Sequence, residues 1–224
     1  MVQIRAVTQD PTAKVSEKKL EILRAASRVF RDKGLHSTGM RDIAAEMGMA
    51  VGNLYYYFED KEELLAFIQE TTLASLLELA ARVQAVELRA DQKLYLLIVG
   101  HVVLLNEGTP GSLAHLEVEA LGKKWRRAVQ ARRDEYERSF RKLVEDGIAA
   151  GIFRRLDSKV GALAILGSAN WTVKWFRPDG GKSAREIGCE TAEILVRGLL
   201  SSGSAWQPPP PDLIATVTEP EPRP

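Results

Sequence analysis

The stretch Ser37 to Leu65, STGMRDIAAEMGMAVGNLYYYFEDKEELL, contains two short apolar-patterned segments on either side of a glycine-containing turn. Its periodicity predicts helices over Met40–Met47 and Val51–Phe58, with Gly48-Met49-Ala50 as the turn between them. Two short helices joined by such a turn form the helix-turn-helix pattern. Asp60 then begins a longer helix as its N-cap, with a glutamate three residues later at the capping-box position. The stretch therefore predicts a helix-turn-helix unit followed directly by a long helix.

The second short helix carries residue types that suit a surface for contacting DNA. Leu54 and Phe58 are four residues apart, so one face of the helix can anchor in a core. The other faces are left to Gly52, Asn53, Tyr55, Tyr56 and Tyr57. An Asn amide both donates and accepts hydrogen bonds, a tyrosine hydroxyl can bond a phosphate, and a glycine lets the backbone approach DNA closely. Lys61 and the N-terminus of the next helix are predicted to hold a further phosphate. Any single tyrosine here can equally be a packed surface aromatic, and it is the whole set in this frame that favours DNA binding.

Outside this stretch, proline placement gives the outline of the chain. Only Pro11, Pro110 and Pro178 precede residue 208, and the other seven prolines crowd into the last 17 residues. Long proline-free stretches without strand-like alternation predict an all-α protein whose first helix runs from Ser16 to Gly34. Further helices are predicted over 60–86, 91–106, between Pro110 and Leu121, from there to Ala150, and over 157–176 and 183–200.

These signals divide the chain into four parts. The predicted parts are a flexible N-terminus over 1–15, a helix-turn-helix DNA-binding domain over 16–60, a larger helical ligand-binding and dimerisation domain over 61–201, and a Pro-rich disordered tail over 202–224.

Composition excludes several classes of protein. There are 31 Lys+Arg against 30 Asp+Glu, a net charge of +1, so any nucleic-acid contact must come from a local patch. The single cysteine, Cys189, excludes an intramolecular disulfide framework, and the sequence shows no Cys/His cluster for a metal. The longest apolar stretch, Leu94 to Leu105, is short of the roughly 20 residues of a membrane span, and the N-terminus lacks the apolar region of a secretory signal. We therefore expect a cytoplasmic protein with no cofactor, no metal and no membrane contact.

An all-helical enzyme acting on an isoprenoid or acyl substrate is the alternative from another class of function. Such an enzyme needs paired carboxylates at metal spacing or a nucleophile beside a base. The chain has three histidines, no DDxxD-like cluster, and no partner for Cys189 nearby in the sequence, so no catalytic residue is predicted.

The Ser37–Leu65 stretch resembles the DNA-binding region of the TetR family of bacterial transcriptional repressors. The residues that carry the resemblance are Thr38, the Ile43-Ala44 pair, Gly48, Leu54 to Phe58, and Lys61. The resemblance implies an all-α homodimer that binds double-stranded operator DNA and releases it when a small molecule occupies the second domain. By position it implies base or phosphate contacts for Arg41, base reading by Val51, Gly52 and Asn53, and backbone contacts for Thr38, Tyr55, Tyr56, Tyr57 and Lys61. The chain departs from the family pattern at Gly39, Ala50 and Val51, where many members carry Ser, Thr or Lys.

Charge is segregated within the second domain. Nine acids and three bases lie between Glu62 and Leu121, whereas nine bases and three acids lie between Gly122 and Lys142. The basic run is either a solvated helix face opposite an acidic neighbour or an anion-binding rim for a phosphate-bearing ligand. The stretch GSANWTVKWFRPDGGKSAREIG, which begins at Gly167, resembles the penultimate-helix region of TetR relatives that respond to acyl-CoA thioesters, and this resemblance favours the rim.

An acyl-CoA thioester is therefore the predicted small-molecule effector. Predicted contacts for its pantetheine or phosphate end are Arg126, Arg127, Arg133, Lys174 and Arg177, with Asn170, Trp171 and Trp175 along one wall. Predicted contacts for its acyl chain are Leu97, His101, Leu104 and Leu116. Two other interpretations stay open, because the tryptophans can simply pack in the core and His101 can be a satisfied core histidine.

Small residues recur on one stripe of the helix predicted over 157–176, namely Gly161, Ala164, Gly167 and Ser168. They would let two helices approach closely, as the family's four-helix dimer interface requires. The same stripe continues to Trp171 and Trp175, so the tryptophans can serve the dimer rather than a pocket. The prediction is a homodimeric TetR-type repressor released by an acyl-CoA, and the alternative is a helix-turn-helix regulator that responds to another apolar ligand or to none.

Overall fold

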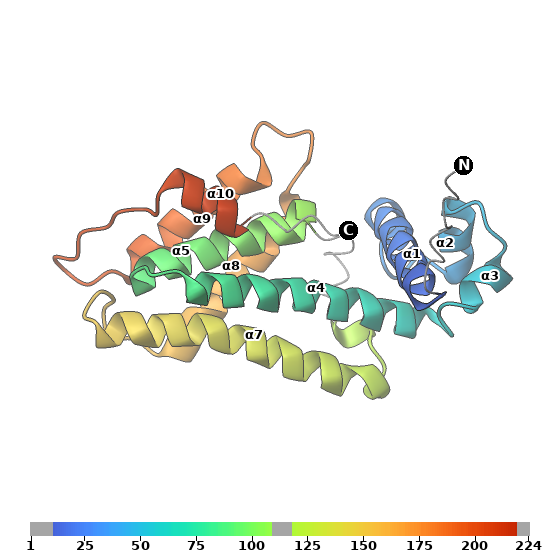
Figure 1. The fold of residues 1–224 in the computed structure, drawn as a ribbon, viewed down its shortest axis with the longest axis horizontal. Helices are drawn as coiled ribbons and strands as arrows, with labels where there is room; N and C mark the ends of the chain where they lie inside the picture. Colours follow the sequence, from blue (N-terminus) through green and yellow to red (C-terminus); the bar gives the residue numbers. More distant parts are fainter. Residues whose placement is uncertain (1–10, 109–117, 219–224) are drawn as a thin grey trace, which may run out of the picture.

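A computed structural model describes residues 11–108 and 118–218, and these residues are helical almost throughout (Figure 1). The only β-type pairing in this part of the chain is an isolated bridge between Phe153 and Leu200. In chain order the helices are α1 (Pro11–Lys33), α2 (Met40–Glu46), α3 (Val51–Tyr55), α4 (Lys61–Ala85), α5 (Ala90–Val103), the π-helical turn η1 (Leu104–Gly108), the 3₁₀ turn η2 (Val118–Ala120), α7 (Lys123–Ala149), α8 (Ser158–Trp175), α9 (Ala184–Leu199) and α10 (Pro211–Thr218). The prediction of an all-α fold is confirmed.

The first helix begins earlier than the sequence predicted. Its predicted start is Ser16, but α1 starts at Pro11, so the flexible segment predicted over 1–15 is wrong for its last five residues. Proline suits the first position of a helix, because its φ is already helical and its missing N–H needs no partner there. α1 ends as predicted before Gly34, whose φ of +83° is left-handed and whose N–H donates to the carbonyl of Phe30 (3.0 Å).

The long helix α4 connects two hydrophobic cores. Figure 1 shows α1, α2 and α3 gathered at one end of α4 and the remaining helices along the rest of its length. Leu64 and Ile68 of α4 pack with α1, α2 and α3, while Leu76 and Leu79 pack with α5, α7, α8 and α9. At 25 residues the helix is about 37 Å long, long enough to serve both ends of the molecule.

Among the described helices, α4 is the one that has the length and hydropathy of a membrane span. Of its most apolar 18-residue window, 56% is buried inside the structure, as in the core helix of a folded protein.

The C-terminal segment packs against the second core. Disorder was predicted over 202–224, and this is wrong for α10, where Ile214 and Val217 are buried and contact α4 and α5. The Arg82 guanidinium of α4 donates to the carbonyl of Val217 (3.2 and 3.3 Å), and the Trp206 ring lies 5.5 Å from that of Tyr95. The apolar residues between the prolines bury enough surface to order the segment. The proline-rich composition of the segment does not show this burial. Residues 219–224 lie outside the described part, as does most of the helix predicted between residues 110 and 121.

Candidate functional site

The turn between α2 and α3 is a helix-ending motif built on Gly48. Its φ is +62°, in the left-handed region that glycine enters at little steric cost. The N–H of Gly48 donates to Ala45 (3.0 Å) and the N–H of Met49 to Ala44 (3.0 Å), which is the Schellman pattern. This motif stops α2 and sets the direction in which α3 leaves it.

Ion pairs fix α2 against α1. Arg28 lies 2.7 Å from Glu46, and Lys33 lies 2.6 Å from Asp42. The Lys33 ammonium, together with the backbone N–H of Gly39, holds the pKa of Asp42 below its usual range. The backbone that presents α3 is therefore held by both packing and charge.

α3 presents one buried and one exposed face, as predicted. Leu54 and Phe58 are fully buried, whereas Asn53 is exposed and the Tyr55 and Tyr56 side chains are 49% and 77% exposed. The helix ends at Tyr55 rather than at Phe58, and the last residues form a looser turn in which the Phe58 N–H donates to Leu54 (3.2 Å).

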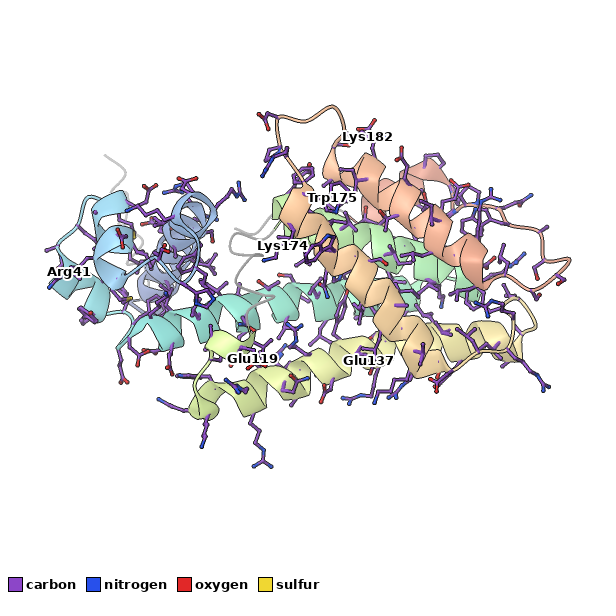
Figure 2. All side chains as sticks on the ribbon, turned by 180° about the vertical axis from the view of Figure 1, so that it is seen from behind. Arg41, Glu119, Glu137, Lys174, Trp175 and Lys182 are labelled. Carbon is purple, nitrogen blue, oxygen red and sulfur yellow. The ribbon has the colours of Figure 1, made fainter. Side chains whose placement is uncertain are left out.

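The other predicted contacts beside α3 differ in exposure. Gly52 is exposed, and a Cβ placed there would meet nothing within 4 Å. Val51 is half-buried, and the half-buried Tyr57 ring packs edge-on against Tyr56 at 5.1 Å. Arg41 is exposed on α2 at the same end of the molecule (Figure 2). The predicted DNA contacts that are exposed are thus Arg41 of α2 and, on or next to α3, Gly52, Asn53, Tyr55 and Tyr56.

Two residues predicted to contact phosphates, Thr38 and Lys61, hydrogen-bond to backbone carbonyls of the chain. The Thr38 side chain is buried, and its hydroxyl donates to the carbonyl of Gly34 (2.8 Å). The Lys61 ammonium donates to the carbonyl of Leu35 (2.6 Å), and partial burial lowers the pKa of Lys61. Both side chains satisfy carbonyl groups just after the C-terminus of α1, where a helix leaves acceptors without partners.

The N-terminus of α4 is also occupied by protein groups. The Asp60 carboxylate accepts from the backbone N–H of Glu63 (2.8 Å), which confirms Asp60 as the N-cap. The Glu63 carboxylate in turn accepts from the N–H of Glu59 (2.6 Å). Acidic side chains complement this helix end, so the phosphate site predicted here is not supported by the geometry.

A cavity of about 410 Å³ lies in the second domain, and we call it the His101 cavity. Its described lining residues come from α4, α5, α7, α8 and η2: Leu73, His101, Val118, Gln130, Arg133, Asp134, Tyr136, Glu137, Leu163, Leu166, Gly167 and Asn170. His101, Arg133 and Asn170 were predicted ligand contacts, and the structure brings these three together.

A hydrogen-bonded chain crosses the floor of this cavity. His101 Nε2 lies 3.1 Å from Oδ1 of Asn170, and His101 Nδ1 lies 3.0 Å from the Tyr136 hydroxyl. Burial lowers the pKa of His101 to about 4 and raises that of Tyr136 well above 10, so at neutral pH the imidazole is neutral and the phenol keeps its proton. An amide oxygen only accepts, so the imidazole proton is on Nε2 and Tyr136 donates to Nδ1.

The buried imidazole makes stability depend on pH. Because the folded-state pKa of about 4 lies below the unfolded value of 6.5, unfolding takes up a proton between these values, and stability present above pH 6.5 is lost as the pH falls toward 4. The full loss from this residue is about 3 kcal/mol, of which about 2 kcal/mol falls between pH 7 and pH 4.5. Urea unfolding at pH 7 and pH 4.5 measures it, with His101→Gln as the variant that should lose this component. An equal pH dependence in the two proteins would contradict the assignment.

A basic groove of about 480 Å³ adjoins the cavity along α7. It is lined by Lys123, Arg126, Arg127, Gln130, Ala131 and Asp134. Two of these residues, Gln130 and Asp134, also line the His101 cavity. Part of this charge is already engaged, since Arg126 donates to the carbonyls of Leu121 and Glu119 (2.9 Å each). The predicted basic set is therefore divided, with Arg133 in the cavity and Arg126 and Arg127 in the groove.

Several other predicted ligand contacts lie elsewhere. Leu97 and Leu104 are packed in the core of the second domain and do not line the His101 cavity, because the buried face of α5 is wider than its cavity-lining part. Leu116 lies outside the described residues. Lys174 and Trp175 lie at the C-terminal end of α8 (Figure 2), and Trp175 and Arg177 line a separate surface depression of about 540 Å³ with Lys182 and Ile194.

The outer face of α8 carries an exposed apolar stripe. Its large members are Val160, Leu163, Trp171 and Trp175, with exposed fractions between 49% and 63%. Of the predicted small residues, Ala164, Gly167 and Ser168 are exposed on this stripe. Gly161 is not, since it is buried and a Cβ there would lie 2.9 Å from Leu156. We call this set, without Gly161, the α8 stripe.

Comparison with known proteins decides the family. Residues 22–68, which span the second half of α1, all of α2 and α3 and the start of α4, match the family described as "Bacterial regulatory proteins, tetR family". Residues 87–199 match the family described as "Tetracyclin repressor-like, C-terminal domain". The chain belongs to the TetR family. It is therefore a DNA-binding transcriptional regulator and not an enzyme, as predicted.

Individual TetR relatives match over most of their length. The repressor KstR2 of Rhodococcus jostii is 27% identical over 202 residues, which cover 86% of this chain and 96% of the relative. PfmR, a TetR family regulator from Thermus thermophilus, superposes with a TM-score of 0.73 at 29% identity, covering 80% of this chain and 99% of PfmR. The structure of AibR in complex with isovaleryl coenzyme A and operator DNA superposes with a TM-score of 0.71 at 27% identity, covering 82% and 98% of the two chains.

Sequence reasoning missed much of the cavity of this TetR chain. Gln130, Tyr136, Glu137 and Leu166 line it but were not predicted. Tyr136 and Glu137 lie within the basic run of α7. The charged residues around them indicated an exposed helix face rather than a cavity wall. The available signal was the aromatic pair Tyr136 and Phe140, four residues apart on a helix that otherwise reads as charged.

Proposed function

We propose that this TetR chain is a transcriptional repressor that binds a palindromic operator as a homodimer, with α3 in the major groove. The exposed face of α3 supports this proposal most directly, because Asn53, Tyr55 and Tyr56 are held outward by the buried Leu54 and Phe58. A helix-turn-helix dimer places its two recognition helices about 34 Å apart, so that they enter successive major grooves.

The α8 stripe is the proposed dimer interface. Exposed apolar side chains that form a continuous patch mark an association surface, and Ile194 of α9 adds a further side chain that is 72% exposed. In this arrangement Trp171 and Trp175 serve the dimer. The interpretation of the two tryptophans as an internal pocket wall is not supported by their exposure.

An acyl-CoA thioester is the proposed effector. The His101 cavity has room for an acyl group, and the adjoining groove offers Lys123 and Arg127 to the phosphates of the coenzyme. The structural relative AibR has been captured with isovaleryl coenzyme A, which supports a thioester in this fold.

α4 supplies a physical route from effector to DNA. Leu73 of α4 lines the His101 cavity and also belongs to the core that contains Leu54 and Phe58 of the DNA-binding end. A ligand that fits the cavity better after a shift of α4 would stabilise that shifted state, and the two recognition helices would no longer match successive grooves. The strength of the switch is limited by the difference in ligand affinity between the two states.

A gel-shift experiment tests this function. The purified chain is incubated with the DNA upstream of its own gene, and acyl-CoA esters of increasing chain length and aromatic acyl-CoAs are titrated into the complex. We expect binding that exceeds binding to random duplex and that falls as salt rises, followed by release on addition of a long or aromatic thioester. No preference over random duplex at physiological salt would reject the DNA-binding role assigned to α3. A stable complex with every thioester would leave the alternative, a regulator that responds to another apolar ligand or to none.

As a regulator that acts on DNA, the protein is proposed to work in the cytoplasm.

A further inference from the structure

Glu137 is one of the residues that line the His101 cavity, and one of its two carboxylate oxygens is buried without a partner in the part of the chain that the structure describes. Its Oε1 atom is buried and has no hydrogen-bond partner among the described residues. Its other oxygen, Oε2, lies 3.9 Å from the Arg141 guanidinium, and the side chain is 16% exposed. Glu137 lies near the middle of α7 (Figure 2). A buried acceptor left without a donor is destabilising, so a ligand that donates a hydrogen bond to this carboxylate would stabilise the site.

Asn170 supplies the complementary group on the opposite helix. Its Oδ1 accepts from His101, whose other nitrogen accepts from Tyr136, so the orientation of the amide is fixed by the chain of hydrogen bonds. The amide nitrogen of Asn170 therefore points away from His101, and it makes no hydrogen bond to the described part of the chain. The cavity thus offers one donor on α8 and one acceptor on α7.

The charge of the lining disfavours an anionic ligand at this point. Arg133 is the single cation among the described lining residues, and the nearby Asp134 opposes its charge. Glu137 then leaves the lining with an excess of one negative charge, because His101 is neutral. A free carboxylate beside Glu137 would meet a like charge in a partly buried site, where repulsion is stronger than in water.

We propose that Glu137 and Asn170 form a subsite that selects a neutral ligand carrying both a carbonyl oxygen and an N–H or O–H group. The Asn170 amide donates to the carbonyl, Glu137 accepts from the N–H or O–H, and the Glu137 charge excludes free carboxylic acids. A thioester with an amide-bearing arm has both groups, whereas the corresponding acid has a carboxylate instead. The inference rests on the proposed function, since it specifies what the effector cavity recognises.

Calorimetric titration of the full chain with a matched pair of ligands tests the subsite. The probes are S-octanoyl-N-acetylcysteamine, a neutral thioester with one amide N–H, and octanoate. The wild-type protein is expected to bind the thioester at least about 10-fold more tightly than the acid. In Glu137→Gln the thioester loses a charge-assisted hydrogen bond and its affinity falls about 10-fold, while that of octanoate rises about 10-fold.

Two further variants serve as controls. Glu135→Gln removes the same charge from an exposed position on α7, outside the cavity lining, and should keep the wild-type ratio of the two affinities. Asn170→Asp keeps an acceptor for His101 but removes the donor, so it should weaken the thioester about 10-fold without admitting octanoate. This second variant tests the subsite even where Glu137→Gln does not fold.

The outcomes separate this inference from the proposed function. Should Glu137→Gln and Asn170→Asp keep the wild-type ratio of affinities, or should the wild-type chain bind octanoate as tightly as the thioester, the subsite is wrong although the effector class stands. If the wild-type chain binds neither this thioester nor any acyl-CoA, the proposed effector class fails and the subsite fails with it.

Discussion

Replacing Trp171 with glutamate is expected to leave the protein monomeric and to weaken operator binding by about 100-fold or more. Trp171 is 62% exposed within the α8 stripe, next in the stripe to Trp175. In a two-fold symmetric interface each substitution appears twice, so two carboxylates would be brought into a desolvated contact without a partner for either. A monomer then holds only one half-site and loses the gain in effective concentration that links the two recognition helices. Sedimentation gives the mass, and a gel shift gives the affinity.

The matched control for this experiment is Ala128→Glu. Ala128 is exposed on α7, away from the α8 stripe, so the same new charge should leave both mass and affinity unchanged. A Trp171→Glu protein that still sediments as a dimer would reject α8 as the interface. A monomeric variant with wild-type operator affinity would instead reject the need for a dimer.

The helix-turn-helix could be predicted from the sequence because its determinants are local. The Gly48 turn, the Asp60 cap and the Leu54–Phe58 anchor all act within a few residues of chain, and each is where the pattern placed it. Rules for helix caps and hydrophobic periodicity describe contacts between residues that are a few positions apart in the chain.

The cavity could be predicted only in part because its contacts are distant in sequence. His101 meets Tyr136 and Asn170 across 35 and 69 residues. Periodicity shows that Leu97 and His101 of α5 and Leu104 of η1 are buried, but it does not distinguish the face that packs on other helices from the face that borders a cavity. Of these three residues, only His101, which has a polar side chain, lines the His101 cavity.

The hydrogen bonds of Thr38 and Lys61 to backbone carbonyls could not be predicted from the sequence for a different reason. A threonine hydroxyl or a lysine ammonium suits a phosphate and a backbone carbonyl equally well, so residue type does not decide between them. The carbonyl of Gly34 is only four residues from Thr38, whereas that of Leu35 is 26 residues from Lys61 and comes within its reach only in the folded chain. The C-terminal tail shows the same limit, because its order comes from a surface on α4 and α5 that the local sequence does not contain.

Replacing Tyr55 with alanine is expected to weaken operator binding about 100-fold without altering its salt dependence. Each subunit would lose a hydrogen bond to a phosphate, worth about 1–1.5 kcal/mol, and the two losses multiply in a dimer. Because a tyrosine carries no charge, its contact releases no counterion and the slope of affinity against salt should stay the same. Gel shifts between about 50 and about 200 mM salt provide the measurement.

Arg41→Gln is the informative comparison, because it removes a charge from an exposed position on the neighbouring helix α2. If Arg41 binds a phosphate, its loss lowers the salt slope by about one in each half-site, whereas a contact to a base edge changes the preference between operator sequences. The two variants therefore separate a neutral from a charged phosphate contact. Wild-type affinity in Tyr55→Ala would show that this face of α3 does not meet the DNA backbone through Tyr55. The next residue to substitute would then be Tyr56, whose side chain is 77% exposed.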